Sequence, residues 1–353
     1  MPLSGAHPYN PAIGTRDAQH DSRDRMILVT GGAGFIGSNL VAGLEARGAG
    51  DIAVVDRLGT GDKWRNVAKR ELAAIVPPEA LTGWLAEHGD AVSMVFHLGA
   101  ISATTERDAD LIVASNFSLS LQLWEWCAAH GVRFVYASSA ATYGDGTAGF
   151  DDDGSPAALA RLRPLNAYGW SKHLFDRRVA RLTAEGRLAP PQWAGLKFFN
   201  VYGPNEAHKG DMRSVVAQIL QQVTAGQPAH LFRSHRPDYP DGGQLRDFVH
   251  VDDCVQVMLW LYDHAGVSGL FNLGTGRARS FADLATAVFH AAGAEPRLAF
   301  VDTPEAIRAR YQYFTEARMD RLRAAGYPGQ FTPLEEGVRR YVQDFLLTDD
   351  PYR

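Results

Sequence analysis

The sequence predicts an α/β fold of the Rossmann type, a doubly wound parallel sheet with a smaller C-terminal α/β substrate-binding lobe. After Arg25, short apolar runs alternate with longer amphipathic runs, a pattern that is typical of βαβ units. A glycine-rich turn separates the first apolar run from the first amphipathic one. The length of 353 residues, 46% of them hydrophobic, is sufficient for one large domain or two with a well-buried core.

The individual elements follow from the position and length of each apolar run. We expect strands at 26–30, 51–56, 93–98 and 133–138, a further strand ending at 198–199, and helices at 35–47, 109–129 and 167–184. From about residue 200 the segments become shorter and more irregular, and Pro and Gly cluster at 236–243. This change of texture indicates a second, smaller lobe.

Composition disfavours several classes of protein. The 35 basic and 40 acidic residues give a net charge of −5, so a nucleic-acid partner is not expected. No apolar stretch reaches the roughly 18 residues of a membrane span, so no membrane association is expected either. The 12 histidines are dispersed, and the two cysteines, Cys127 and Cys254, are too few for a thiolate metal site. We expect no metal and two buried free thiols.

Residues 1–25 are polar, contain prolines and glycines, and lack the apolar run of a secretory signal. We expect a disordered N-terminal extension and a cytoplasmic protein.

The glycine-rich turn has the spacing of a phosphate-binding loop. Gly31, Gly34 and Gly37 stand three residues apart, between a predicted strand and a predicted helix, and Phe35 and Ile36 lie between the last two. In such a loop one glycine permits a tight turn, one lets the backbone approach a pyrophosphate, and one permits close helix packing. The N-terminus of the helix would supply N–H donors to the phosphates.

An acidic residue follows at the distance that a dinucleotide-binding unit needs. Asp56 ends the second predicted strand, about 20 residues beyond the turn, where a carboxylate accepts the ribose 2′-hydroxyl of NAD. Arg57 and Lys63 lie close by, and either cation could accept the 2′-phosphate of NADP. We therefore expect residues 26–200 to form a dinucleotide-binding domain, with returns near 245–275, and residues 201–353 to form mainly the substrate-binding lobe.

A tyrosine and a lysine indicate acid/base chemistry. Tyr168 and Lys172 stand at i and i+4 of a predicted helix, so both lie on one face. An adjacent ammonium is expected to lower the pKa of the phenol, which would suit Tyr168 to proton exchange with a carbinol hydroxyl. Ser139 follows a strand end, where its hydroxyl could hydrogen-bond a substrate oxygen or simply cap the next turn.

Together these motifs resemble the extended short-chain dehydrogenase/reductase superfamily and, among its sugar-nucleotide epimerases, the ADP-glyceromanno-heptose 6-epimerases. The resemblance covers residues 26 to about 347. Its most distinctive strings are GAISATTE at 99–106, FNVYGPNEAHKG at 199–210 and RYQYFT at 310–315, with RDFVHVDD at 246–253 and NLGTG at 272–276 in support.

The resemblance implies an NADP-dependent isomerase, with NAD as the alternative cofactor. Its substrate would be ADP-D-glycero-β-D-manno-heptose, oxidised at C6″ to a ketone and reduced on the opposite face to the ADP-L-glycero epimer. The acid/base groups would be Tyr168 and Lys209, assisted by Ser139, and Lys172 would hold the nicotinamide ribose. A homo-oligomer is implied, by family resemblance a homopentamer, and the helices at 109–129 and 167–184 could pack between its subunits.

The resemblance also carries over contacts to individual positions. Besides the residues of the glycine turn, the implied cofactor contacts are Asp56, Arg57, Lys63, Leu98, Gly99, Ala100, Ile101, Ser102, Asn116, Lys172, Val201 and Lys209. The implied substrate contacts are Ser139, Asn200, Asp211, Gln218, Phe232, Arg233, Ser234, His235, Arg246 and Tyr311. Asp211 and Gln218 depart from the family pattern, and the segment at 232–246 is longer than usual, so fine substrate specificity stays open.

Three alternatives from the same or other classes are distinguishable. A UDP-hexose 4-epimerase would use the same tyrosine but has no need of the His208-Lys209 loop, and a 4,6-dehydratase would carry an Asp-Glu pair where Ala141 and Thr142 stand. A catalytically silent nucleotide-sensing protein need not retain Tyr168.

The shortage of lysine supports an enzyme. Only five lysines accompany 30 arginines. Three of them, Lys63, Lys172 and Lys209, fall at predicted cofactor or catalytic positions, and a base must be able to lose its proton, as arginine cannot. Lys69 and Lys197 have no such assignment.

Overall fold

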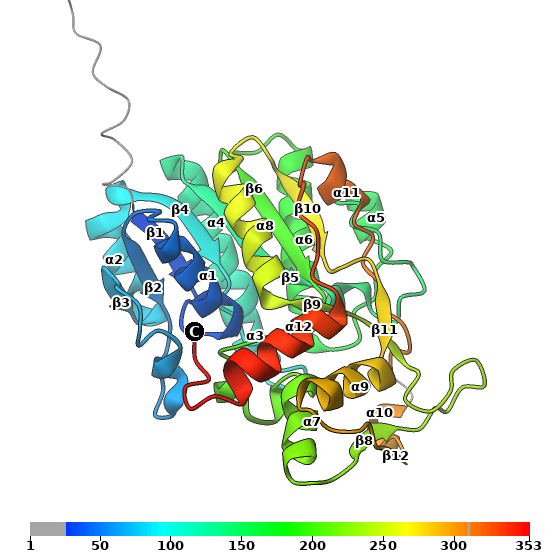
Figure 1. Ribbon diagram of the computed structural model, residues 1–353. Helices are drawn as coiled ribbons and strands as arrows, with labels where there is room; N and C mark the ends of the chain where they lie inside the picture. Colours follow the sequence, from blue (N-terminus) through cyan, green and yellow to red (C-terminus); the bar gives the residue numbers. More distant parts are fainter. Residues whose placement is uncertain (1–25, 309–310) are drawn as a thin grey trace, which may run out of the picture.

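The computed structural model describes residues 26–308 and 311–353, so the predicted extension at 1–25 lies outside the described residues. A parallel sheet of seven strands forms its centre (Figure 1). In the order of the sheet the strands are β3 (Ala74–Val76), β2 (Ile52–Val55), β1 (Met26–Thr30), β4 (Val92–His97), β5 (Arg133–Ser139), β6 (Trp193–Phe198) and β10 (Gly269–Leu273). This is the 3-2-1-4-5-6 order of a doubly wound sheet with one strand added. The predicted fold class is confirmed.

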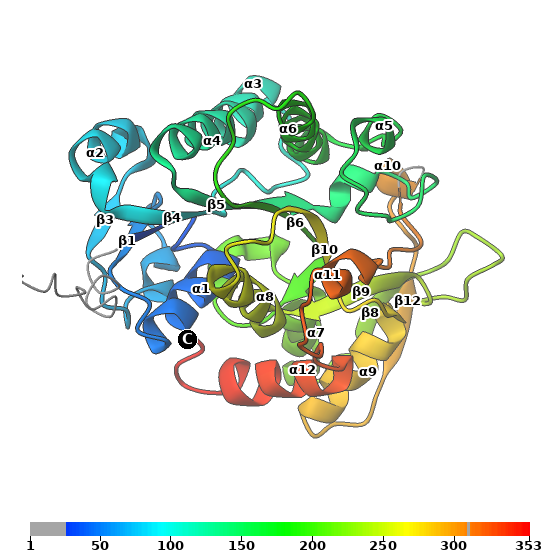
Figure 2. The same cartoon turned by 90° about the horizontal axis from the view of Figure 1, so that it is seen from above.

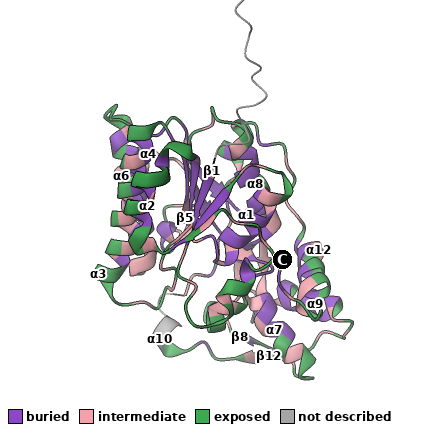
Figure 3. Cartoon of the chain, turned by 90° about the vertical axis from the view of Figure 1, so that its left-hand side faces the viewer, coloured by how far each residue is buried: buried purple, intermediate pink, exposed green. Residues whose placement is uncertain are grey.

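Helices cover both faces of the sheet (Figure 2). One face carries α2 (Leu81–His88), α4 (Leu119–His130) and α6 (Ala167–Ala184), and the other carries α1 (Phe35–Ala46), α8 (Val251–Asp263) and α11 (Asp320–Ala324). Because successive strand side chains point to opposite faces, Ile27 and Val29 of β1 join one core cluster and Leu28 joins the other. The strands are accordingly buried between two helical layers (Figure 3).

A smaller lobe packs around a third core cluster. Its helices are α7 (Val215–Thr224), α9 (Phe281–Ala291) and α12 (Leu334–Tyr341). Its strands form two small sheets, β11 (Ala278–Ser280) with β9 (Leu245–His250) and β7 (Asn200–Tyr202), and β12 (Leu298–Val301) with β8 (Ala229–Phe232). The chain returns from this lobe to the main layers through α8 and β10, which follow β9 directly.

The helix predicted at 109–129 is one continuous run with a wider turn inside it. It consists of α3 (Ala109–Ile112), a π-helical turn η4 (Val113–Ser118) and α4. Such turns often occur at functional sites. The helix predicted at 167–184 is found with the same bounds as α6. Strand β3 was not predicted, because its three residues are too short to give a periodic pattern.

The remaining short elements connect these layers. They are the helices α5 (Pro156–Leu159) and α10 (Glu305–Arg308), the 3-10 segments η1 (Asp62–Asn66), η2 (Pro78–Ala80), η3 (Gly89–Ala91), η5 (Ala140–Tyr143) and η6 (Ala207–Met212), and the π-helical η7 (Val342–Leu346). Cys127 and Cys254 are both buried free thiols, as expected. Within residues 26–308 and 311–353, no helix is long and apolar enough to cross a bilayer.

Candidate active site

A cavity of about 660 Å³ opens at the carboxyl ends of β1, β4 and β5. The sheet reverses its strand order between β1 and β4, which is where ligands bind in doubly wound folds. The main domain and the smaller lobe both line the cavity. It brings together these predicted residues: Gly31, Gly34, Phe35, Ile36, Gly37, Asp56, Lys63, Leu98, Gly99, Ala100, Ser102, Ser139, Tyr168, Lys172, Asn200, Val201 and Lys209.

The glycine turn fits a pyrophosphate. Gly31 has a φ of +68°, and a Cβ there would lie 2.6 Å from the backbone nitrogen of Gly99. A Cβ on Gly37 would lie 2.1 Å from the carbonyl oxygen of Gly31, so α1 could not approach the turn with any larger residue. Gly34 is the N-cap of α1 and provides no side-chain cap, which leaves the first N–H groups of the helix available to an anion.

Asp56 lies at the end of β2 and organises the ribose end of the cavity. One of its oxygens accepts from the backbone N–H of Ala33 at 3.0 Å, and the other accepts from Lys63 Nζ at 2.6 Å. Arg57 points away, toward Glu79, which its Nε meets at 2.8 Å on the surface. Both cations near the predicted ribose site are therefore already paired with carboxylates.

Tyr168 and Ser139 are brought together by close packing of α6 on η5. A Cβ on Gly169 would lie 2.7 Å from the carbonyl oxygen of Ala141, so only glycine permits this approach. The side chain of Asn166 caps the helix by accepting from the N–H of Gly169 at 2.8 Å. As a result the Ser139 hydroxyl reaches the Tyr168 phenol at the wall of the cavity.

The electrostatics of this pair differ from the prediction. Burial raises the pKa of the Tyr168 phenol, and only the hydrogen bond with Ser139 opposes it. Burial also lowers the pKa of Lys172 to about 8, against the charge of Asp176. The expectation that Lys172 lowers the pKa of Tyr168 is wrong, because loss of hydration raises it and the opposing effect comes from Ser139, not from Lys172.

The π-helical turn aims Asn116 at the loop after β4. The Asn116 amide is fully buried and makes two hydrogen bonds with the backbone of Ile101, at 2.8 and 2.9 Å. It also donates to the hydroxyl of Ser171 at 3.0 Å, and Ser171 donates to the carbonyl oxygen of Tyr168. Asn116 and Ile101 do not line the cavity. They act by joining its cofactor loop to the helix that carries Tyr168.

A buried ion pair lies under the same helix, and it explains Lys197. Lys197 Nζ lies 2.6 Å from Asp176 Oδ2, and the two side chains are 1% and 0% exposed. Asp176 stands one turn beyond Lys172 and also accepts from Tyr136 and Ser138. No sequence pattern indicated this pair, because its members are separated along the chain and each resembles an ordinary surface charge.

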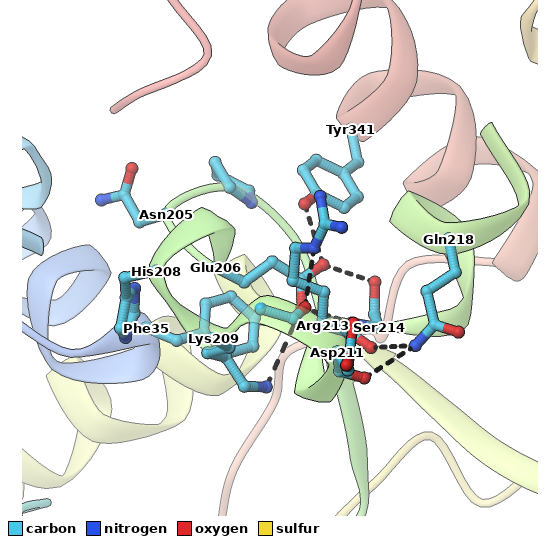
Figure 4. A network of polar contacts seen from close by, with 12 residues as sticks. Phe35, Asn205, Glu206, His208, Lys209, Asp211, Arg213, Ser214, Gln218 and Tyr341 are labelled. Atoms are coloured by element: carbon cyan, nitrogen blue, oxygen red, sulfur yellow. Dashed lines mark hydrogen bonds and ion pairs between the residues drawn. The ribbon is translucent and has the colours of Figure 1, made fainter. Parts of the chain in front are cut away.

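Lys209 enters the cavity from η6, between β7 and α7. Its ammonium lies 5.0 Å from the ring centroid of Phe35 and 3.9 Å from the carboxylate of Glu206 (Figure 4). Burial lowers the pKa of Lys209, and the charge of Glu206 opposes this change. His208 lies beside it, hydrogen-bonded to Asn66, and burial lowers the pKa of His208 to about 4.

The residues predicted to contact substrate fall into two further groups. Tyr311 contacts both Arg246 and Phe232: the Arg246 guanidinium lies 5.5 Å from the Tyr311 ring centroid, and the Phe232 and Tyr311 rings lie 5.9 Å apart. Arg246 also lies 5.6 Å from the ring of Phe281, which lines the cavity, so this group adjoins the cavity. The loop that follows Phe232, with Arg233, Ser234 and His235, extends toward the surface.

Asp211 and Gln218 line a separate cavity of about 360 Å³. Gln218 donates to the carbonyl oxygens of Asp211 and Arg213, so it holds the loop that contains Lys209 (Figure 4). The structure therefore does not bring these two residues together with Tyr168.

Sequence reasoning missed several residues of the main cavity. They include Ser138, His208, Ser214, Phe248 and Phe281, all of which line the cavity. His208 had a signal, since it precedes Lys209 in the same motif. The others face the cavity only because of tertiary packing. Among the described residues, no cluster of His, Cys, Asp and Glu could hold a metal ion.

The family model described as the NAD dependent epimerase/dehydratase family matches residues 27–274. The chain belongs to this family. A relative of this epimerase/dehydratase from Nitratidesulfovibrio vulgaris (strain DP4) is 52% identical over 330 residues, which cover 93% of this chain and 100% of the relative. Another, from Fusobacterium nucleatum subsp. nucleatum, is 45% identical over 335 residues with the same coverage. Both are named ADP-L-glycero-D-manno-heptose-6-epimerase, which confirms the predicted resemblance.

Solved structures agree with this membership of the epimerase/dehydratase family. The ADP-L-glycero-D-manno-heptose-6-epimerase of Helicobacter pylori has a TM-score of 0.75 and 26% identity, covering 94% of this chain and 99% of that one. The UDP-glucose 4-epimerase of Thermus thermophilus, solved in complex with NAD, has a TM-score of 0.69 and 27% identity, covering 90% and 97%. The glycine turn and Asp56 fit the nicotinamide dinucleotide that the family description names.

Proposed function

We propose that the protein converts ADP-D-glycero-β-D-manno-heptose into ADP-L-glycero-β-D-manno-heptose by inverting C6″. The observation that carries this proposal is that one cavity holds Tyr168, Lys209 and the dinucleotide-binding turn. Tyr168 comes from a helix on one face of the sheet, and Lys209 comes from a loop of the smaller lobe. Two acid/base groups from different elements suit a reaction that handles the same carbon from both faces. The names of the relatives support the choice of an ADP-heptose.

The chemistry assigns a separate step to each acid/base group. A bound nicotinamide would accept hydride from C6″ and return it. Lys209, whose pKa is lowered, takes the hydroxyl proton as the carbinol becomes a ketone. The ketone turns about its bond to C5″ and presents its other face, and Tyr168, whose pKa is raised, gives a proton to the new alkoxide. One proton has then moved from Tyr168 to Lys209, and the reverse reaction or exchange with water restores it.

Supporting residues hold the reacting groups. The Ser139 hydroxyl hydrogen-bonds the phenol and is placed to share the same substrate oxygen. Lys172 is 4% exposed and lies one helical turn from Tyr168, in position for the nicotinamide ribose. Asn200 and Val201 of β7 line the same cavity.

Arg246 suits the nucleotide diphosphate. Its side chain donates to the carbonyl oxygens of Leu245 and Gln312, and none of the carboxylates in the described part of the chain pairs with it. A purely structural salt bridge for Arg246 thus lacks a partner within 26–308 and 311–353. A guanidinium that is 8% exposed and beside aromatic rings would be stabilised by a phosphate.

We further propose that the dinucleotide is NADP, with NAD as the alternative. Asp56 can accept a ribose hydroxyl, which serves NAD. Arg57 is bound only to the exposed Glu79, a kind of surface pair that is worth little, so its guanidinium can turn toward a 2′-phosphate. Mass spectrometry of the cofactor released from the purified protein distinguishes the two.

A homo-oligomer is also proposed. Leu111 on α3 and Trp170 on α6 are 46% and 41% exposed, and these helices pack side by side. An exposed apolar pair on neighbouring helices suits a contact between copies. Sedimentation of the wild type and of the Trp170→Lys variant tests this contact, because loss of oligomer in the variant alone would support it.

The test of function is direct. Purified protein without added cofactor is offered each C6″ epimer of ADP-heptose, and the product is identified by NMR. Formation of the same equilibrium mixture from both epimers supports the proposal. Turnover of UDP-hexoses alone would replace it with a 4-epimerase, and absence of any turnover by cofactor-loaded protein would favour a nucleotide-sensing protein.

A further inference from the structure

We propose that Glu206 is the positioning residue for Lys209, holding its loop closed and stabilising the protonated state of its amine, so that the side chain can both take and return a proton; this inference rests on the acid/base role of Lys209 proposed above. Glu206 is 1% exposed and lies outside the cavity lining. It therefore acts through Lys209 and does not touch substrate.

The Glu206 carboxylate is held by three donors from two directions (Figure 4). The backbone N–H of Ser214 donates to Oε2 at 2.6 Å, and the hydroxyl of Ser214 donates to Oε1. Tyr341 of α12 donates to Oε1 at 2.8 Å. Burial raises the pKa of Glu206, and the Lys209 ammonium and the three donors oppose that rise by stabilising the ionised carboxylate.

The same carboxylate fixes the loop. Glu206 precedes η6 and Ser214 follows it, so their contact closes the segment that carries Lys209. The backbone N–H of Lys209 donates to the carbonyl oxygen of Glu206 at 3.0 Å, which completes the turn. Ser214 is the N-cap of α7, yet its hydroxyl makes no cap bond and is used for Glu206. Because Tyr341 of α12 donates to the same carboxylate, Glu206 links the loop to the smaller lobe.

The charges around Lys209 explain why a carboxylate is needed. Burial favours the neutral amine, and its ammonium lies near the ring of Phe35 and the side chains of Glu206 and His208. Glu206 supplies the opposing charge, 3.9 Å away. A lysine that takes a proton in one direction of the reaction and returns it in the other must be able to exist in both its neutral and its protonated form. The carboxylate of Glu206 stabilises the protonated form of Lys209 against burial.

The experiment measures the Lys209 ammonium itself. The chain has only five lysines, so 13C placed at their ε carbons gives five NMR signals. The signal that is missing in the Lys209→Met variant is that of Lys209. The pKa of Lys209 is then titrated in the wild type, in Glu206→Gln and in Tyr341→Phe. We expect Glu206→Gln to lower it by about 1–3 units, the effect of an opposite charge at this distance. Tyr341→Phe, which retains the carboxylate, should shift it far less.

Each outcome decides the inference. An unchanged Lys209 pKa in folded Glu206→Gln would overturn it, as would equal shifts in the two variants. If Glu206→Gln does not fold, the wild-type titration decides, because the Lys209 signal must respond a second time at acidic pH when Glu206 is protonated, and a single step contradicts the pairing. The titration needs no substrate, so it can succeed even where the ADP-heptose assay fails. Where that assay succeeds with the D-glycero epimer as substrate, the acidic limb of turnover, which reports loss of the neutral Lys209 base, should move to lower pH in Glu206→Gln and not in Tyr341→Phe.

Discussion

The two proposed acid/base groups of the cavity, Tyr168 and Lys209, are held in different ways. Tyr168 lies in α6, an 18-residue helix with a side-chain cap, a close glycine contact and a buried ion pair beneath it. Lys209 lies in a 3-10 segment that is closed by the carboxylate of Glu206. The comparison shows that Tyr168 is positioned by a long helix packed on the sheet, whereas Lys209 is positioned by a short loop held by one carboxylate.

The largest expected effect comes from removing either group. Tyr168→Phe and Lys209→Met should each lower turnover by about 10²–10⁴-fold, the usual value of a positioned acid/base group, with cofactor still bound. Steady-state assays with ADP-heptose measure this loss. Tyr262→Phe, which removes a phenol that donates to Ala49 far from the cavity, and Lys69→Met, which removes a surface ion pair with Asp350, are the matched controls. Full activity in Lys209→Met would remove its role.

Removing the buried ion pair beneath α6 should lower the free energy of unfolding. Lys197→Met leaves Asp176 buried and unpaired, which costs about 3–5 kcal/mol of unfolding free energy. Denaturant unfolding measures the loss. Arg181→Gln, which breaks an exposed pair with Glu185, is the control and should cost at most about 0.5 kcal/mol. A loss for Lys197→Met no larger than the control would show that the buried pair does not anchor α6.

Acid should destabilise the protein through its buried histidines. Burial lowers the pKa of His97 to about 3 and those of His173 and His250 to about 4. Below the unfolded-state pKa of about 6.5, the unfolded chain binds more protons than the folded one, so stability falls as pH falls from about 6.5 to 4. Unfolding curves across this range should show a smaller slope for His173→Gln and an unchanged slope for the exposed His130→Gln.

The smallest expected effect concerns cofactor choice. Glu79→Ala releases Arg57 from its surface partner and should raise the affinity for NADP relative to NAD by roughly 2- to 5-fold, since such pairs are worth about 0.5–1 kcal/mol. Titration of the cofactor-free protein with each dinucleotide measures the ratio. A ratio that does not change would mean that Arg57 takes no part in the choice.

Local sequence patterns predicted the elements of the fold better than the chemistry of the site. The strands at 26–30, 51–56, 93–98 and 133–138, the helix at 167–184 and the glycine turn follow from periodicity and spacing, because each depends on residues close together in the chain. The Lys197–Asp176 pair and the Glu206–Tyr341 contact each join segments that are far apart in the chain. A spacing pattern in the sequence therefore cannot predict them. The pKa of Tyr168 was predicted in the wrong direction, because a sequence shows the neighbouring charge but not the loss of water around the phenol.

The departures from the family pattern have a structural account. Gln218 holds two carbonyl groups of the Lys209 loop, and Asp211 lies in that loop. Their predicted contact with substrate was inferred from matching positions, and it stays a prediction because they face a separate cavity.

The central claim is that Tyr168 and Lys209 serve opposite faces of one substrate carbon. The most direct measurement offers each C6″ epimer separately to cofactor-loaded Tyr168→Phe and Lys209→Met in a single turnover and detects the ketone by mass spectrometry. Each variant should form the ketone from only one epimer, and the two variants should accept opposite epimers. Ketone from the same epimer in both variants would contradict the account.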